Sequence, residues 1–277
     1  MNKELIKTSV KLTAAISLGA LISPAAQATS IIGGSTLLDS ASLSQLEGYL
    51  GESQLDVTNI FTKRAGSETQ AASTTYDFHE AADGQGRTFS VLRASGIATA
   101  LDGSTTQFSK VIGGYNPLSW DVNGFYNFTF DPALRTAFLF SLSDNTLFRQ
   151  NTAIVPNNGD TGVYQTLSHF SYGPTFGGGY DLLTENNLTS GYANGYSYTN
   201  NLPYTSNNYT LLLGLGDAQI NLNNGTNNFN IDDLEVFTIA GSPSISSVPL
   251  PAALPLMSSA IGLFGFGAAK RKNKSLA

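Results

Sequence analysis

Apolar residues follow two different spacings along the central part of the chain. Three leucines between residues 43 and 50 recur at the interval of one helix face, and Gly51 follows them directly. Asp39 or Ser40 precedes the run as a candidate N-cap. The pattern predicts a short helix here, and a brief helical turn within residues 74–86 that runs into a Gly-containing loop.

Beyond the first helix, short runs of β-branched and aromatic residues alternate with turn-forming Gly, Asn and Ser. Such runs are typical of strands joined by turns. Strands are predicted at residues 88–94, 109–115, 125–130, 136–142, 180–185, 209–216 and 229–239. Residues 55–67 are rich in the same residue types. The chain is therefore predicted to be β-dominated α+β.

Two of these strands have distinctive patterns. Residues 136–142 are nearly continuous in apolar residues and include Phe138 and Phe140, which predicts a central strand covered on both faces. In residues 229–239 the alternation breaks at two adjacent aspartates, as at a β-bulge, and the strand itself is predicted over residues 234–239.

Two polar, glycine-rich stretches, residues 150–173 and 186–206, show no clear period. They are predicted to be long loops, which in compact domains are usually functional or mobile. The body between the two ends of the chain shows no internal repeat and has the length of one ordinary domain. We place this domain at residues 29–240.

The first residues of the chain have the pattern of a secretory signal peptide. Three lysines within residues 3–11 precede a mostly apolar stretch, and Ala26 and Ala28 form an A-x-A cleavage site. Residues 1–28 are therefore predicted to be removed by signal peptidase, which cleaves between Ala28 and Thr29 while the rest of the chain is exported.

The C-terminal end combines an apolar stretch with a basic cluster. Residues 252–269 contain no charged residue and, as a helix, would reach about 27 Å, close to the hydrocarbon thickness of a bilayer. Three lysines and one arginine follow within residues 270–274 and are expected to stay on the cytoplasmic side. The alternative interpretation is a buried C-terminal helix. Residues 241–247, which are rich in Ser and include one Gly and one Pro, are predicted to be a flexible linker.

A short motif stands before this apolar stretch and consists of Val248, Pro249, Leu250, Pro251 and Ala252. The order of motif, apolar transmembrane span and basic end over residues 248–277 resembles the PEP-CTERM sorting signals in their VPLPA form. The resemblance implies transient anchoring in the inner membrane of a Gram-negative bacterium and cleavage by an exosortase-type enzyme. The implied destination is the cell envelope, the cell surface or the extracellular matrix.

Between its two ends the chain is acidic and free of cysteine. Outside residues 1–28 and 248–277, seven Lys and Arg stand against nineteen Asp and Glu, which leaves a charge of about −12. Nucleic acid is therefore not expected as a partner, because its phosphates require basic side chains. The absence of cysteine excludes disulfides and thiol chemistry.

Seven segments appear in an order that is characteristic of one known domain family. They are STLLDSASLSQLEGYLG at residues 35–51, LDVTNIFTKRAGS at 55–67, YDFHEAADGQGRTFSVLRAS at 76–95, KVIGGYNPLSW at 110–120, AFLFSLS at 137–143, FGGGYDLL at 176–183 and IDDLEVFTI at 231–239. In this order the chain resembles the TLDc domain of the oxidation-resistance protein family, with Ile112 where that family more often has Phe. The resemblance implies a two-sheet antiparallel β-sandwich with a few short flanking helices.

The positions that match the family motifs are mostly aromatic, glycine or acidic: Phe78, His79, Gly113, Gly114, Tyr115, Trp120, Phe138, Phe140, Gly177, Gly178, Asp181 and Glu235. Some eukaryotic members regulate the vacuolar proton pump from the cytosol, a role that an exported bacterial protein would not share. The resemblance therefore implies a non-catalytic binding or protective module, linked to oxidative stress resistance, and no enzyme.

His79 is the most reactive-looking side chain of the body. It lies between Asp77 and Glu80, and histidine is the usual general base near neutral pH. A hydrolase that uses His79 with an acid is one hypothesis, but no serine stands in a nucleophile elbow. In the other interpretation Phe78 packs inward and His79 bonds a nearby backbone group. His169 has less context still.

Acidic residues in turns suggest a metal hypothesis. Calcium prefers oxygen ligands, but no stretch has the Asp-rich loop and distal Glu of an EF-hand. A calcium site assembled from separate loops and a set of solvated turn acids stay open as alternatives, and no other cofactor is predicted. The acids in question are Asp83, Asp102, Asp160, Asp232, Asp233 and Glu235.

The glycines of VIGGY and FGGGY fit neither the P-loop nor the dinucleotide fingerprint. Close backbone approach or bends in strands explain them better. Trp120, the only tryptophan, is predicted to anchor the core, although with Tyr115 it could also line a sugar-binding surface.

A carbohydrate- or matrix-binding sandwich is the alternative to a TLDc-type module. The tyrosines that could stack on sugar rings are Tyr192, Tyr196, Tyr198, Tyr204 and Tyr209. The expected partners are signal peptidase, an exosortase-type enzyme and an unknown envelope protein or polysaccharide.

Overall fold

The computed structural model describes residues 29–67, 70, 72–100, 102–154, 159–202, 212–215, 221–222 and 228–240. The predicted signal peptide, the linker and the sorting signal with its apolar span lie outside these residues. In the part of the chain that is described, no helix is both long and apolar enough to cross a membrane.

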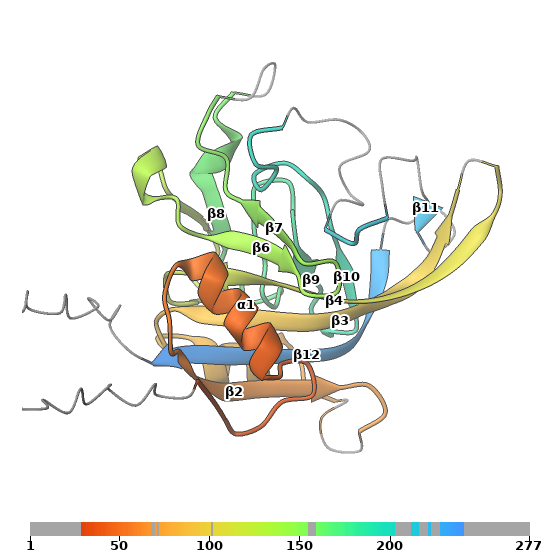
Figure 1. Cartoon of the computed structure of the whole chain (residues 1–277), viewed down its shortest axis with the longest axis horizontal. Helices are drawn as coiled ribbons and strands as arrows, with labels where there is room; N and C mark the ends of the chain where they lie inside the picture. Colours follow the sequence, from red (N-terminus) through yellow and green to blue (C-terminus); the bar gives the residue numbers. More distant parts are fainter. Residues whose placement is uncertain are drawn as a thin grey trace, which may run out of the picture.

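Most strands belong to one large sheet (Figure 1). Its order is β1 (Ser30–Ile32), β2 (Asp56–Arg64), β12 (Asn228–Ala240), β3 (Thr88–Thr99), β4 (Thr105–Asn116), β6 (Phe138–Ser141) and β7 (Thr146–Arg149). Three short strands extend it: β10 (Ser190–Tyr192) pairs with β12 and with β9 (Leu183–Thr184), and β11 (Asn221–Leu222) pairs with β3. The pair of β1 and β2 is parallel, and the other described pairs are antiparallel.

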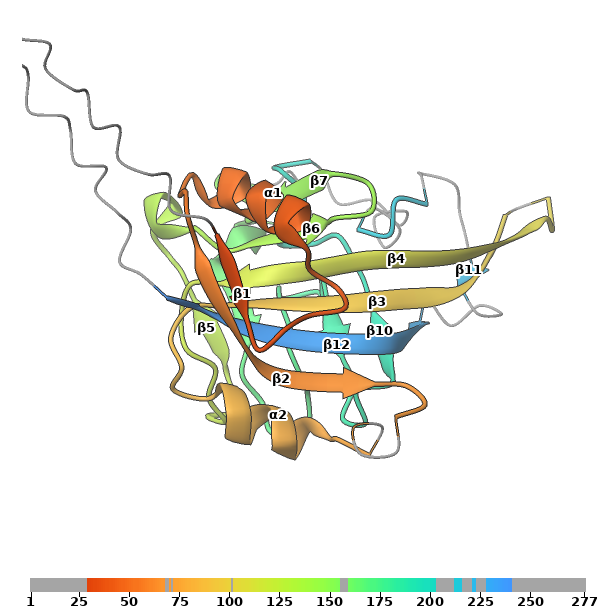
Figure 2. The ribbon, with the colours of Figure 1, turned by 60° about the horizontal axis from the view of Figure 1, so that its bottom comes forward.

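A second, two-stranded antiparallel sheet consists of β5 (Tyr126–Phe128) and β8 (Tyr164–Leu167). The described helices are α1 (Ser40–Leu50) and α2 (Thr75–Ala82), with short 3-10 turns η1 (Pro132–Leu134) and η2 (Thr161–Val163). Figure 2 shows α1 and α2 on opposite sides of the large sheet. The predicted β-dominated, two-sheet sandwich with short flanking helices is confirmed, with one parallel strand pair in addition.

The large sheet is buried on both faces because its strands alternate between two cores. Along β3, Phe89 and Val91 pack in the core that contains the leucines of α1. Leu92 and Ala94 face the other way and pack in the core that contains Trp120 and the buried phenylalanine of α2. Each helix therefore closes one face of the same sheet.

Helix α1 forms where the sequence predicted it. Asp39 is the N-cap, and its Oδ1 accepts a hydrogen bond from the backbone N of Ser42 at 2.8 Å. Gly51 ends the helix in the left-handed conformation, with a φ of 72°, which glycine adopts without steric cost. Leu43 and Leu46 are fully buried against the sheet.

Strand β6 lies between β4 and β7, and all of its residues are buried. Phe138 and Phe140 pack in the core under α1, while Leu139 packs in the opposite core. The prediction of a strand covered on both faces is therefore confirmed.

Strand β12 contains the predicted bulge but is longer than expected. Its register against β3 shifts between Ile231 and Asp233, and its register against β2 shifts between Val236 and Phe237. The strand begins at Asn228, well before the predicted start at residue 234, because its first residues pair with β10.

Three local predictions were wrong. The stretch 150–173 contains η2 and β8, and the stretch 186–206 contains β10. Both strands are short, so neither contains enough residues to show a period. β8 pairs with the distant β5, and β10 pairs with the distant β12 as well as with the nearby β9. The described part of the strand predicted at 209–216 is a turn at residues 212–214, where Gly214 has a φ of 65°.

Replacing Phe140 by Ala is predicted to lower the free energy of unfolding by about 3 to 5 kcal/mol, because the fully buried ring leaves a cavity. Urea denaturation measures the change. Phe130→Ala is the matched control, since that ring is 73 % exposed, and it should cost less than about 1 kcal/mol. Equal effects of the two substitutions would contradict the position assigned to β6.

Candidate functional site

Glu235 is a fully buried carboxylate in β12. It accepts hydrogen bonds from Ser35 Oγ, from the backbone N and Oγ1 of Thr36 at 3.0 and 3.1 Å, and from Arg64 Nη2 at 3.1 Å. A buried carboxylate without such donors would strongly destabilise the fold. This family-motif residue therefore joins the segment before α1 to β2 and β12.

His79 is buried on α2, and both of its ring nitrogens have partners. Nδ1 lies 2.8 Å from Asp83 Oδ1, and Nε2 lies 3.1 Å from the carbonyl oxygens of both His169 and Tyr172. Because carbonyl oxygens only accept hydrogen bonds, Nε2 is the donor. Phe78 packs inward with no exposed surface. The interpretation in which His79 bonds nearby backbone groups is confirmed, and the bond to Asp83 is an addition.

The acids that flank His79 in sequence serve other purposes. Asp77 Oδ2 accepts hydrogen bonds from the backbone N and Oγ1 of Thr74 at 2.7 and 3.1 Å, which closes a capping box at the start of α2. The bond from the Thr74 backbone lowers the pKa of Asp77. Glu80 is exposed. The helix thus uses its acids for capping and solvation, away from the imidazole.

Asp181 is a second buried carboxylate among the family-motif positions. Its Oδ1 accepts three hydrogen bonds, from the backbone N of Tyr196, Ser197 and Tyr198 at 2.7, 2.7 and 2.8 Å. Burial raises the pKa of Asp181 to about 7, although these three bonds act in the opposite direction. Asp181 therefore holds the 196–198 segment in place.

The motif glycines permit close packing. A side chain at Gly113 would collide with the ring of Phe140, and one at Gly114 would collide with the ring of Phe176. Gly177 has a φ of 79°, and a side chain there would meet Asp181. Gly178 likewise has no room beside the ring of Tyr164. The explanation by close backbone approach is confirmed.

Trp120 anchors the core, as predicted. It is fully buried, its Nε1 donates to Thr88 Oγ1 at 2.9 Å, and its ring packs edge-on against Phe176 at 5.5 Å. Tyr115 is buried in the opposite core. The hypothesis that Trp120 and Tyr115 line a sugar-binding surface is therefore wrong.

The acids proposed for calcium are dispersed over the structure. No group of three or more His, Asp or Glu within the described ranges is arranged to hold a metal ion. Five of these acids bind other side chains: Asp83 binds His79, Asp102 binds Ser104, Asp160 binds Arg135, Asp233 binds Arg93, and Glu235 binds Arg64. Calcium binding stays a hypothesis without a donor set in the described part of the chain.

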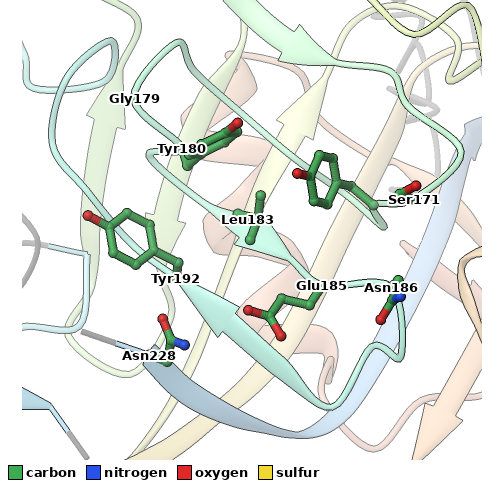
Figure 3. Close-up of a pocket in the computed structure, with 9 residues that line it drawn as sticks. Ser171, Gly179, Tyr180, Leu183, Glu185, Asn186, Tyr192 and Asn228 are labelled. Atoms are coloured by element: carbon green, nitrogen blue, oxygen red, sulfur yellow. The ribbon is translucent and has the colours of Figure 1, made fainter. Parts of the chain in front are cut away.

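An open cavity of about 460 Å³ lies beside β9 and β10 (Figure 3). Its lining is largely aromatic and polar. None of the twelve motif positions named above belongs to it, although three lining residues lie within the family segment FGGGYDLL. The lining residues are Ser171, Tyr172, Gly179, Tyr180, Leu183, Glu185, Asn186, Tyr192 and Asn228. This cavity is the candidate functional site.

Strand register builds one wall of the cavity. Leu183, Tyr192 and Asn228 are direct neighbours across β9, β10 and β12, so their side chains share one face. Glu185 follows Leu183 by two residues, and Figure 3 shows its carboxylate near Tyr192 and Asn228. Gly191 faces the other way, where a side chain would collide with the ring of Phe229.

Tyrosines line another part of the cavity. The rings of Tyr172 and Tyr180 are 6.2 Å apart at an angle of 58°. Burial raises the pKa of Tyr126, which interacts with Tyr180, to about 12, and the charge interaction with Tyr180 adds a smaller effect. Burial also raises the pKa of Tyr172. The hydroxyls of Tyr126 and Tyr172 therefore stay protonated at neutral pH and can donate and accept hydrogen bonds.

Helix α2 is hydrogen-bonded to two of the segments that line the cavity. Nε2 of His79 binds the carbonyl oxygen of Tyr172, and the backbone N of Thr75 donates to the carbonyl oxygen of Asn186 at 3.1 Å. His79 is thus a positioning residue for the segment that ends at Tyr172, and the backbone of Thr75 holds the segment at Asn186.

Sequence reasoning found part of this site. Of the tyrosines predicted to stack on sugars, Tyr192 lines the cavity, Tyr196 packs against the ring of Tyr164 at 6.5 Å, and Tyr198 is buried. Tyr204 and Tyr209 lie outside the described residues. The other eight lining residues were missed, among them Tyr172, Tyr180, Glu185 and Asn228. The spacing of Leu183 and Glu185, two residues apart in a predicted strand, indicates that they lie on the same face of the strand.

The fold and the buried motif residues define a β-sandwich domain with two cores on one shared sheet. The family model of the TLDc domain matches residues 31–240, so the chain belongs to the TLDc domain family. A search of curated proteins finds no match.

Replacing Asp181 by Asn is predicted to flatten the dependence of stability on pH. The folded-state pKa of about 7 lies above the ordinary value of 3.8, so the folded state binds this proton more tightly. The stabilisation by Asp181 is present below about pH 4 and is lost as the pH rises through about 7. Asn retains an oxygen for the three backbone donors and does not titrate.

Urea denaturation of both proteins between about pH 4 and pH 8 measures this difference. The free energy of unfolding of the natural protein should fall relative to that of the Asp181→Asn variant as the pH rises. Parallel profiles would contradict the raised pKa, because all other carboxylates titrate equally in the two proteins.

Proposed function

We propose that this TLDc-domain protein is exported and acts as a non-catalytic binding or protective module in the cell envelope. The observation that best supports this function is the separation of its reactive side chains from its open cavity. His79, Asp181 and Glu235 are buried and bonded within the scaffold. The cavity instead presents tyrosine rings and amides, which are groups suited to binding.

A catalytic role would require a nucleophile or a general base with an orienting partner that faces the substrate. Glu185 is the only carboxylate among the described lining residues, and no His, Lys or Cys is among them. Ser190 Oγ already donates to Glu185 Oε2 at 2.5 Å. These features favour the binding module over a hydrolase that uses His79.

Membership in an oxidation-resistance family suggests a protective role, and the composition restricts how it would work. The chain has no cysteine, and its two methionines are Met1 and Met257, outside the domain. Sulfur in the domain therefore cannot be the group that reacts with oxidants. Protection would have to come from binding an envelope component.

The proposed export depends on signals at the two ends of the chain. Signal peptidase would remove residues 1–28, and an exosortase-type enzyme would act at residues 248–252. The partner at the destination would be an envelope protein or polysaccharide. Carbohydrate binding is the second candidate function, and the tyrosine-lined cavity favours it.

Fractionation of a Gram-negative host that has an exosortase-type enzyme tests the proposal. The mature chain should begin at Thr29, occur in the envelope fraction and co-purify with envelope proteins or glycans after cross-linking. N-terminal sequencing identifies the first residue. A chain that retains Met1 and stays in the cytoplasm would overturn the proposed function.

Replacing Pro249 and Pro251 by Ala is predicted to block sorting without blocking membrane insertion. The apolar span and the basic cluster are unchanged, but the recognition motif is lost. Uncleaved protein should accumulate in the inner membrane, as measured by immunoblots of membrane fractions. Pro243→Ala, in the linker, is the matched control and should be processed normally. Normal processing of the double variant would contradict the assignment of the motif.

Deleting all residues after Ser247 is predicted to leave a folded, soluble domain. The described cores are completed by residues up to Ile239 and need no contribution from the apolar tail. Circular dichroism and size-exclusion chromatography of the exported, truncated protein measure this. Aggregation or unfolding would support the alternative of a C-terminal helix buried in the domain.

A further inference from the structure

We propose that the cavity beside β9 and β10 binds a sugar ring of a neutral glycan, with the tyrosines as a platform and the polar side chains as hydrogen-bonding groups. This inference rests on the proposed function as a binding module and names its ligand class.

The tyrosine rings supply an apolar surface of the right form. Tyr172 and Tyr180 adjoin each other, with centroids 6.2 Å apart and ring planes at 58°, so their rings form two adjoining, inclined faces. Leu183 lies beside them, and Tyr192 lies next to Leu183 across the strand pair. The C–H faces of a sugar ring are apolar and can pack on such rings while the hydroxyls point outward.

Tyr180 is held in an unfavourable backbone conformation. Its φ is 58°, which is rare for a bulky residue and costs free energy. The surrounding turn enforces it, because Tyr180 N donates to Gly177 O at 3.3 Å and Asn194 Nδ2 donates to Gly179 O at 3.0 Å. A backbone strain that places one aromatic ring in an open cavity is the kind found at binding sites.

Polar groups surround this platform and match the hydroxyls of a sugar. Asn186 and Asn228 each carry two N–H donors and one carbonyl acceptor, and Ser171 adds a hydroxyl. Glu185 accepts hydrogen bonds, with Oε1 remaining beside the oxygen bound to Ser190. Figure 3 shows the side chains of Glu185, Asn228 and Tyr192 grouped on one side of Leu183.

The charge and the ring arrangement of the cavity lining favour neutral glycans over acidic sugars and quaternary ammonium ions. A carboxylate is present in the described lining and no basic side chain is, so an acidic sugar would be repelled. A quaternary ammonium ion needs aromatic faces across a gap that it can occupy. Tyr172 and Tyr180 instead contact each other, which favours a platform over a cage.

The size and rigidity of the site also fit a small ring. The cavity of about 460 Å³ lies within the usual range of ligand sites. Its walls are tied down by hydrogen bonds from His79 to Tyr172 O, from Thr75 N to Asn186 O, and from Glu185 N to Ser190 O. A site that is already ordered loses less entropy on binding.

Titration of the purified full chain with defined probes tests the inference. A polyoxyethylene detergent is used, because its headgroup contains neither sugar nor ammonium. The probes are neutral oligosaccharides of glucose, galactose and mannose, an oligosaccharide of galacturonic acid, and choline. Saturation-transfer NMR and calorimetry should detect binding of at least one neutral oligosaccharide, and no binding of the acidic one or of choline.

Substitutions locate the binding. Tyr192→Ala removes one ring, and Tyr180→Asn removes another with a residue that tolerates positive φ. Each should weaken binding of the neutral probe by on the order of tenfold. Tyr76→Ala is the matched control, because Tyr76 is 74 % exposed on α2 and does not line the cavity. Its affinity should equal that of the natural protein.

Glu185→Gln provides a further check that does not depend on removing a ring. Gln retains an oxygen that can accept from Ser190, so the fold should be preserved while the negative charge is lost. Binding of the neutral probe should weaken by a few fold, because a charged acceptor becomes a neutral one, and exclusion of the acidic probe should weaken as well. Thermal melting confirms that each variant is folded, and an unfolded Tyr180→Asn leaves Tyr192→Ala and Glu185→Gln to decide.

Three results would overturn the inference: failure of every neutral probe to bind, preferred binding of choline or of the acidic probe, or equal affinity in the Tyr192→Ala and Tyr76→Ala variants. The proposed function is judged separately. A mature chain that reaches the envelope and cross-links there, but shows one of these results, refutes the glycan site alone. A chain that never leaves the cytoplasm refutes the proposed function.

Discussion

The burial of the Glu235 carboxylate is the constraint on which the domain depends. Strand β12 lies between β2 and β3, so a charge there must receive hydrogen bonds from the protein itself. Ser35 and Thr36 bring donors from the segment before α1, and Arg64 brings one from the end of β2. Ser35 Oγ also accepts from the two leucine amides that follow, which turns the chain toward α1. The first and last elements of the domain are thereby joined.

The same need to satisfy buried polar groups explains the positions of the named family-motif residues, which do not line the candidate cavity. His79, Asp181 and the motif glycines each satisfy or permit a backbone contact in the interior. Their chemistry is used to hold segments in place. The candidate cavity is lined by other residues, of which Tyr180 and Leu183 lie in the family segment FGGGYDLL while Tyr192 and Asn228 lie outside the family segments.

The cavity forms where segments distant in sequence meet. Tyr172 and Tyr180 come from the stretch before β9, Tyr192 comes from β10, and Asn228 begins β12. The residues that surround them in the sequence show no alternation that would predict a shared face. The tyrosines proposed from composition alone therefore lie in different places. Tyr192 lines the cavity, whereas Tyr198 is buried and donates to Gln165 O at 2.6 Å.

The sequence by itself determined the features that depend on neighbouring residues. Asp39 and Gly51 delimit α1, the continuous apolar run of β6 requires cover on both faces, and the broken alternation of β12 marks its bulge. Tertiary structure alone decided the pairing of β10 with β12, the partners of His79 and the residues of the cavity. The physical reason is that caps and periodicity are local, whereas strand register and the solvation of buried charges depend on atoms far apart in the chain.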